Sequence, residues 1–169
     1  MFYDAIVQYH KTLGNLDAIL GKAMAHAEER KFSADNFCTQ RIAPDMLPFA
    51  RNVMIACDTA KAAAGAFSGR AVPKFEDTET TIPELRERIA KTIALLATFS
   101  AADFAETTAA TIVKIPFPPG KAMLAGEALM TRSIPNFFFH VSMVYAMIRA
   151  GGVTIGKMDY LGTLNQFDQ

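Results

Sequence analysis

The feature of this sequence that most constrains its fold is the three-and-four spacing of apolar residues at the N-terminus. Over residues 2–30 the spacing aligns Phe2, Ile6, Tyr9, Leu13, Leu16, Leu20 and Ala23. A helix turns once every 3.6 residues, so side chains at these spacings share one face. The pattern predicts a long amphipathic helix whose apolar face packs against other elements.

Three further segments have the same helical period: residues 45–68, 81–99 and 133–150. In the first of them, Pro48 suits the opening turn of a helix, and the many alanines indicate close approach to a neighbour. The second opens with the sequence TIPE, in which Thr81 and Glu84 can form a capping box. The third ends at Gly151-Gly152, a common helix stop.

The connection between the third and fourth helices differs from the rest of the chain. Residues 107–131, TTAATIVKIPFPPGKAMLAGEALMT, are rich in β-branched side chains around a Pro-Pro-Gly turn. This composition fits either a loose hairpin or an extended crossover. We therefore predict an all-α fold, a four-helix bundle with a long, partly extended connection between helices three and four. Residues 1–169 form one domain, with a tail after about residue 160.

Charge and composition narrow the class of protein. Lys+Arg and Asp+Glu both number 17, so the basic excess expected of a general nucleic-acid binder is missing. Charges alternate in ELRERIAK, residues 84–91, which predicts a solvated helix face. The longest apolar stretch, residues 135–152, is interrupted by His140 and is shorter than the roughly 20 residues that span a bilayer. We expect no membrane association.

The two cysteines and the N-terminal sequence indicate the cellular compartment of the protein. Cys38 and Cys57 are far apart and form no CxxC motif, which favours free thiols in a reducing compartment. The first residues lack a basic segment followed by an apolar run, so we expect no signal peptide. These features predict a cytoplasmic protein.

The fourth helix is apolar on almost every side, which predicts burial in the bundle, against a second subunit, or both. We therefore predict a homodimer.

One candidate site follows from the polar residues of the apolar helices. The sequence contains no GxSxG, no HExxH and no clustered Cys/His set. Asn136 and His140 lie one turn apart on the fourth helix, and Asp58 interrupts the apolar and alanine stretch of the second. An imidazole, an amide oxygen and a carboxylate can bind a divalent metal such as zinc or nickel. Water bound to that metal would be a nucleophile near neutral pH.

Each of these residues also has a structural explanation. His140 can be a hydrogen-bonded core histidine, and Asn136 can cap its helix after Ile134-Pro135. Asp58 can pair with Lys61 one turn on, or with Arg51. The residue pattern leaves both explanations open.

Several segments resemble one family. The stretches FYDAIVQYHKTLGNL, RIAPDMLPFARNVMIACDTAK, TIPELRERIAKTI and PNFFFHVSMVYAMIRAGGVTIGKMDYLG are similar to a domain-of-unknown-function family of the DinB/YfiT-like superfamily, whose members are regarded as metalloenzymes. The resemblance covers about residues 2–162. It implies a DinB-like four-helix bundle, often dimeric, and it brings no established reaction.

The resemblance also implies where a metal would bind. In the superfamily, one histidine from helix two and two from helix four, spaced by four, hold a divalent metal, and members include thiol transferases and damage-inducible proteins. His140 matches the second helix-four histidine, Asn136 stands at the earlier position, and Asp58 is nearest the helix-two position. Two of the three histidine positions therefore hold other residues.

Two functions remain in view. In the first, Asp58, Asn136 and His140 form a polar pocket at the superfamily's metal position, for metal-assisted hydrolysis or transfer on a small molecule. In the second, the metal site has decayed, and the protein is a non-catalytic dimer that binds a small molecule or a partner protein. Polar residues on apolar faces favour the first, because each would cost roughly 1–3 kcal/mol if buried without a partner. The missing histidines favour the second.

Overall fold

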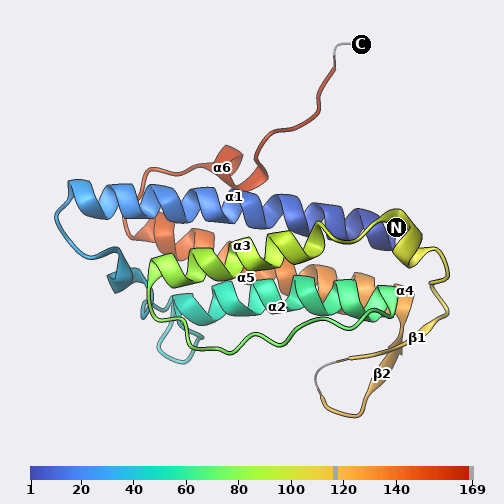
Figure 1. The fold of residues 1–169 in the computed structure, drawn as a ribbon. Coiled ribbons are helices and arrows are strands. Elements are labelled where there is room, and N and C mark those ends of the chain that lie inside the picture. Colours follow the sequence, from blue (N-terminus) through green and yellow to red (C-terminus); the bar gives the residue numbers. More distant parts are fainter. Residues whose placement is uncertain (116–117, 168–169) are drawn as a thin grey trace.

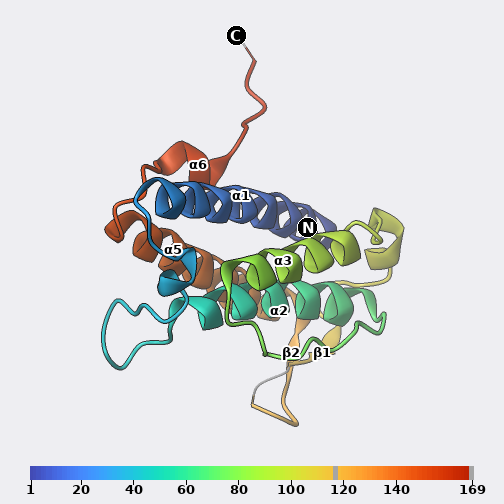
Figure 2. The same ribbon diagram turned by 60° about the vertical axis from the view of Figure 1, so that its left-hand side comes forward.

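Four long helices pack side by side in the computed structural model, which describes residues 1–115 and 118–167 (Figure 1). They are α1 (Phe2–Glu29), α2 (Phe49–Ser68), α3 (Ile82–Leu96) and α5 (Ile134–Ala150). Helix α2 contacts α5 on one side and α3 on the other, and α1 contacts both α3 and α5 (Figure 2). The N-terminal periodicity therefore predicted the first helix to within one residue of its observed end.

Short elements connect the long helices. They are the 3₁₀ helices η1 (Ala34–Phe37) and η2 (Ala101–Phe104), the strands β1 (Ile112–Lys114) and β2 (Ala122–Leu124), the helix α4 (Ala125–Glu127), the π-helix η3 (Ala128–Ser133) and the helix α6 (Lys157–Leu161). The two strands are antiparallel, with Val113 opposite Met123. The hairpin predicted as one of two possibilities is therefore present, and the all-α prediction needs correction by this small sheet. Residues 116–117 of the predicted hairpin lie outside the described residues.

Two helix boundaries differ from the prediction. Helix α2 begins at Phe49 rather than at residue 45, because Pro48 has extended backbone (φ −69°, ψ 161°) and is the N-cap. Helix α3 ends at Leu96 rather than at residue 99. The capping box at its start is confirmed, since Thr81 Oγ1 accepts from the Glu84 amide and the Glu84 carboxylate accepts from the Thr81 amide at 3.0 Å.

The fourth long helix starts earlier than predicted. Its α-helical part begins at Ile134, but the helical turns of α4 and η3 lead into it from Ala125 without a break. A π turn widens the backbone spiral by one residue, and such turns occur frequently at functional sites. The segment before residue 125 is β-branched and rich in proline, so the apolar periodicity of the sequence did not reveal these additional helical turns.

Small side chains and aromatic rings fill the centre of the molecule. Ala56, Ala60 and Ala64 of α2 are fully buried, which agrees with the close approach predicted from its alanines. The rings of Tyr9 and Phe137 meet with centroids 4.3 Å apart. Most of the apolarity of α5 is thus explained by burial within this chain.

Helix α6 packs against α1, and beyond α6 the described chain leads away from the bundle (Figure 1). Asp159 of α6 pairs with Lys22 at 2.5 Å, and Asn15 donates to the Tyr160 carbonyl at 3.0 Å. Gly162 follows with a φ of +65°, and a Cβ there would lie 2.4 Å from Asn15 Oδ1, so only glycine fits this close approach. Within the described part of the chain, no helix is both long and apolar enough to cross a bilayer.

Candidate functional site

Two polar contacts join α2 to α5 across an otherwise apolar seam. His140 Nδ1 lies 2.8 Å from Asn52 Oδ1, and Asn136 Nδ2 donates to Thr59 Oγ1 at 2.7 Å. The two helices run antiparallel here. Asn136 and His140, one turn apart on α5, face Thr59 and Asn52, which lie about two turns apart on α2. His140 is therefore a hydrogen-bonded core histidine, which is one of the two explanations that the sequence left open.

The hydrogen bonds of Asn52 fix the tautomer of His140. The Asn52 amide nitrogen donates to the carbonyls of Leu47 and Pro48, at 3.1 and 3.0 Å. Its oxygen therefore faces the imidazole and can only accept, so His140 Nδ1 carries the proton. Burial lowers the pKa of His140 below its ordinary value, because the charged form loses its hydration. His140 is thus a neutral imidazole in a fixed orientation.

Asp58 does not join Asn136 and His140. Its Oδ2 accepts from Arg88 Nη2 at 2.9 Å. Its Oδ1 lies 2.9 Å from Lys61 Nζ, an ion pair that is not aligned as a hydrogen bond. The pairing with Lys61 considered in the sequence is confirmed, whereas Arg51 pairs with Asp77 instead, at 2.6 Å.

The donor groups do not fit the metal that the resemblance implies. The α2 residues that meet Asn136 and His140 are Thr59 and Asn52, and neither supplies the imidazole or carboxylate that a third metal ligand would need. The carboxylate of Asp58 is occupied by two cations. Among the residues that the structure describes, no group of three His, Cys, Asp or Glu side chains is arranged to hold a metal ion.

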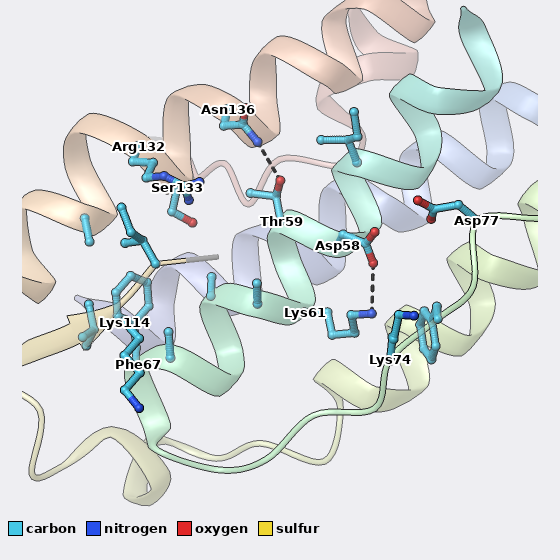
Figure 3. Close-up of a pocket in the computed structure, with 18 residues that line it drawn as sticks. Asp58, Thr59, Lys61, Phe67, Lys74, Asp77, Lys114, Arg132, Ser133 and Asn136 are labelled. Carbon is cyan, nitrogen blue, oxygen red and sulfur yellow. Dashed lines mark hydrogen bonds and ion pairs between the residues drawn. The ribbon is translucent and has the colours of Figure 1, made fainter. Parts of the chain in front are cut away.

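The idea that Asn136 caps its helix is wrong. No side chain caps the start of α5, because η3 continues directly into it. The amide of Asn136 turns instead toward Thr59 and lines a cavity beside the seam (Figure 3).

This cavity contains two of the three predicted site residues, Asp58 and Asn136; His140 does not line it, and sequence reasoning missed the rest of the lining. It has a volume of about 530 Å³. Its described lining comes from α2, the linker between α2 and α3 (residues 69–81), β1 and the η3–α5 junction: Ile55, Asp58, Thr59, Lys61, Ala62, Ala63, Ala66, Phe67, Lys74, Phe75, Asp77, Val113, Lys114, Ile115, Ala128, Arg132, Ser133 and Asn136. The size and the mainly apolar lining are typical of small-molecule sites.

The floor of the pocket is the outer stripe of α2. Ile55, Thr59, Ala62 and Ala66 follow one another at spacings of four, three and four, so they share one face. The alanines leave room because they have no side chain beyond Cβ. Repeated alanine at this spacing is the one sequence signal of the pocket, and it indicates helix packing equally well.

Ion pairs hold the linker that forms one wall. Arg88 of α3 is 2% exposed and bonds Asp58, Asp77 and Glu79, the last through both carboxylate oxygens at 2.9 and 3.0 Å. We call these four residues the charge cluster. Phe75 lies against it, with Lys61 Nζ 4.1 Å from the ring centroid. The aromatic ring is thus held at the pocket wall by cations on α2 and α3.

The expectation of a solvated face for ELRERIAK is wrong at Arg88. Leu85, Ile89 and Thr92 are fully buried, and Arg88 lies between them in the helix, on the same side. The charged residues near Arg88 in the sequence suggested that it is exposed to solvent. The informative signal was instead its helical spacing from the buried apolar residues, which places it on the same face. The guanidinium is buried because the linker supplies carboxylates that the local sequence does not show.

The opposite wall is the π turn. Ala128, Arg132 and Ser133 of η3 line the pocket (Figure 3). Ser133 Oγ lies 2.9 Å from the hydroxyl of Tyr9, whose pKa burial raises to about 12. Tyr9 is therefore a neutral phenol that anchors the turn from the core.

Both cysteines are free thiols, as predicted, and both are buried. Burial raises the pKa of Cys57 to about 12 and that of Cys38 to about 11. Since the thiolate is the reactive form, neither residue is poised as a nucleophile.

Comparisons with known proteins agree with the architecture. Residues 1–161 match the family model described as "Domain of unknown function (DUF1993)". A crystal structure described as a DinB family member protein from Shewanella denitrificans is 41% identical, with a TM-score of 0.93. That match covers 100% of this chain and 96% of the other. No curated protein matches.

Proposed function

The chain belongs to the DUF1993 family of domains of unknown function, and we propose that it is a non-catalytic protein that binds a small, largely apolar molecule in the pocket beside the α2–α5 seam. The four long helices and the DinB family neighbour support the DinB-like four-helix bundle predicted from the sequence. The pocket lies against the pair of helices on which the superfamily holds its metal.

The observation that carries this proposal is the pocket itself. A cavity of about 530 Å³ is large enough for a ligand of modest size. Its walls are positioned by buried contacts, Arg88 with the linker on one side and Tyr9 with Ser133 on the other. A site held in this way is organised before the ligand arrives, which lowers the conformational cost of binding.

The chemistry of the lining supports binding rather than catalysis. His140 is not among the lining residues, and Asp58 is neutralised by Arg88 and Lys61. A general base needs a free acceptor within reach of the substrate. In the described lining, the two carboxylates, Asp58 and Asp77, are both engaged in ion pairs.

Filling the pocket tests the proposal. Ala62→Phe places a ring on the floor of the cavity, and Ala94→Phe places the same ring on the exposed face of α3 as a control. We expect a neutral apolar fluorophore such as N-phenyl-1-naphthylamine to bind the wild type and the Ala94→Phe variant. Its affinity for Ala62→Phe should fall by at least about tenfold, or ~1.4 kcal/mol. Unchanged binding to Ala62→Phe would place the probe elsewhere and contradict the proposal.

A second candidate function, metal-assisted hydrolysis or transfer, is favoured by one observation. Asn136 and His140 lie one turn apart on α5, the spacing of the superfamily's ligand pair, and each faces α2. A metal would bind His140 at Nε2 and Asn136 at Oδ1, which the hydrogen bonds to Asn52 and Thr59 leave unused, and the third group of the hypothesis, Asp58, would have to leave Arg88 and Lys61. Thermal unfolding with added zinc or nickel separates the two functions.

We expect the added metal to leave the melting temperature unchanged, since Asp58, the third group of the hypothesis, is held by Arg88 and Lys61. A saturable rise, lost in His140→Ala but kept in a His26→Ala control, would instead favour the metal-assisted function. At a hundredfold excess over the dissociation constant, binding to the folded state would add about 2.7 kcal/mol to the free energy of unfolding.

A further inference from the structure

The pocket is elongated along α2. Its floor residues run from Ile55 to Ala66 on one face of the helix, a distance of roughly 16 Å at the rise of about 1.5 Å per residue. A sphere with the volume of this pocket would be only about 10 Å across. The volume is therefore drawn out along the helix axis.

The linker follows this floor on one side (Figure 3). A Cβ on Gly65 would lie 3.0 Å from Val72 Cγ1, and one turn earlier in α2 the Nζ of Lys61 lies 4.1 Å from the ring centroid of Phe75. Rising residue numbers in the linker thus meet falling numbers in α2. The linker runs antiparallel to the floor and forms a long wall rather than a single point of contact.

The η3–α5 junction follows the floor on the other side. Asn136 bonds Thr59, and His140 bonds Asn52 two turns nearer the start of α2. Ala128 of η3 lines the pocket further toward the end of α2. This wall is therefore also antiparallel to the floor. A pocket between two such walls fits an extended chain better than a compact molecule of the same volume.

The part of the pocket nearer the start of α2 offers uncharged polar groups. Thr59 and Asn136 line it, and the Asn136 amide nitrogen donates to the Thr59 hydroxyl. The Oδ1 of Asn136 accepts no hydrogen bond from a described residue, so it can accept one from a ligand. The carboxylates of Asp58 and Asp77 are already paired with cations of the protein.

The part of the pocket nearer the end of α2 is apolar at its base. Ala63, Phe67 and Val113 line it, and each is itself almost completely buried. Lys114 and Arg132 line the same part. Aliphatic stems of such side chains cover apolar surface while their charged groups reach water or a partner. The two ends of the pocket thus differ in polarity.

From this arrangement, and resting on the proposed binding function, we propose that the ligand is an unbranched aliphatic compound with an uncharged polar head group, such as an alcohol or an amide. The head group lies near Thr59 and Asn136, and the chain extends over Ala62 and Ala66 toward Phe67. A charged head group would lose its hydration without gaining a partner, because the carboxylates beside Thr59 are already paired.

Three alcohols separate a chain from a ring. Calorimetric titration of the full chain with hexan-1-ol, octan-1-ol and cyclooctanol compares two chain lengths and two shapes. We expect octan-1-ol to bind about fifteenfold more tightly than hexan-1-ol, since each buried methylene group raises affinity about fourfold. Cyclooctanol has as many carbon atoms as octan-1-ol, but its ring cannot extend along the floor. It should bind at least about tenfold more weakly than octan-1-ol.

A matched pair of variants tests the direction of the chain. Ala66→Leu narrows the apolar end of the pocket, and Ala94→Leu adds the same side chain on the exposed face of α3. Ala66 lies roughly 10 Å beyond Thr59 along α2, so decan-1-ol reaches it and hexan-1-ol does not. We expect Ala66→Leu to weaken decan-1-ol binding at least about tenfold and hexan-1-ol binding less than about twofold. Ala94→Leu should change neither affinity.

The outcomes separate this inference from the proposed function. Cyclooctanol binding as tightly as octan-1-ol overturns the unbranched chain, and an equal loss of hexan-1-ol and decan-1-ol in Ala66→Leu overturns its direction. If N-phenyl-1-naphthylamine binds as proposed and none of the alcohols does, the aliphatic ligand is wrong and the binding function stands. If the fluorophore binds Ala62→Phe as well as wild type, the binding function fails and this inference fails with it.

Discussion

At the scale of single residues, the contact between His140 and Asn52 gives a sign for the pH dependence of stability. Burial lowers the pKa of His140 in the folded state, whereas the unfolded chain has the ordinary value near 6.5. Between the two values the unfolded state binds the proton more readily than the folded state. The contribution of His140 to the free energy of unfolding is therefore constant above about pH 6.5, and it falls as the pH drops below that value.

We predict that His140→Gln removes this part of the pH dependence. The difference in the free energy of unfolding between wild type and variant, measured by urea denaturation, should change between pH 7.5 and pH 5 in the direction that disfavours the wild type at low pH. His10→Gln is the control, because the side chain of His10 is less buried than that of His140. A difference that does not vary with pH would mean that His140 keeps its ordinary pKa in the folded protein.

At the scale of elements, the linker depends on one side chain from α3. Arg88 contacts carboxylates from α2 and from the linker, and it also donates to the Glu76 carbonyl at 2.9 Å. Removing one partner from a buried ion-pair network leaves the remaining charges without compensation. The linker wall of the pocket should therefore loosen when Arg88 is lost.

We predict that Arg88→Met lowers the free energy of unfolding by about 2–4 kcal/mol. This lies slightly below the usual ~3–5 kcal/mol for breaking a buried pair, because Asp58 and Asp77 are partly exposed to solvent. Lys91→Met, on the same helix, breaks only the exposed pair with Glu87 and should cost less than about 1 kcal/mol. Chemical denaturation measures both, and equal effects would contradict the structural role of Arg88.

The π turn is the second element that shapes the pocket. It places Arg132 and Ser133 toward the cavity, and Tyr9 anchors Ser133 from the opposite side. We predict that Tyr9→Phe keeps the ring packing against Phe137 and weakens binding of N-phenyl-1-naphthylamine, because Ser133 loses its anchor at the pocket wall. Fluorescence titration of wild type and variant measures the affinity. Unchanged affinity would show that the Tyr9 hydroxyl does not position this wall.

At the scale of the whole molecule, the homodimer stays a prediction. Burial against α1 and α2 explains most of the apolar surface of α5, but Phe139 and Met130 are 50% and 57% exposed. We expect the protein to sediment as a dimer and Phe139→Ser to shift it toward the monomer. Analytical ultracentrifugation over a range of concentrations measures the shift, with Val7→Ser on α1 as an exposed apolar control. A monomer at every concentration would contradict the prediction.

The sequence by itself determined the helices, because their signals are local. The stripe from Phe2 to Ala23 marks α1, and the Thr81–Glu84 capping box marks the start of α3. Side chains three and four apart meet on a helix whatever the rest of the chain does. The resemblance to a DinB-like family rested on the same segments, and the family match confirms it.

The pocket and the partners of the polar residues were decided by the tertiary structure. Asp58 and Arg88 are 30 residues apart, and His140 and Asn52 are 88 apart. Such pairs depend on how helices are placed against one another, and helical periodicity carries no information about which turn of one helix faces which turn of another. The sequence therefore located the right helices for a site, whereas only their packing showed that Asp58 turns away from His140 and that the cavity opens beside them.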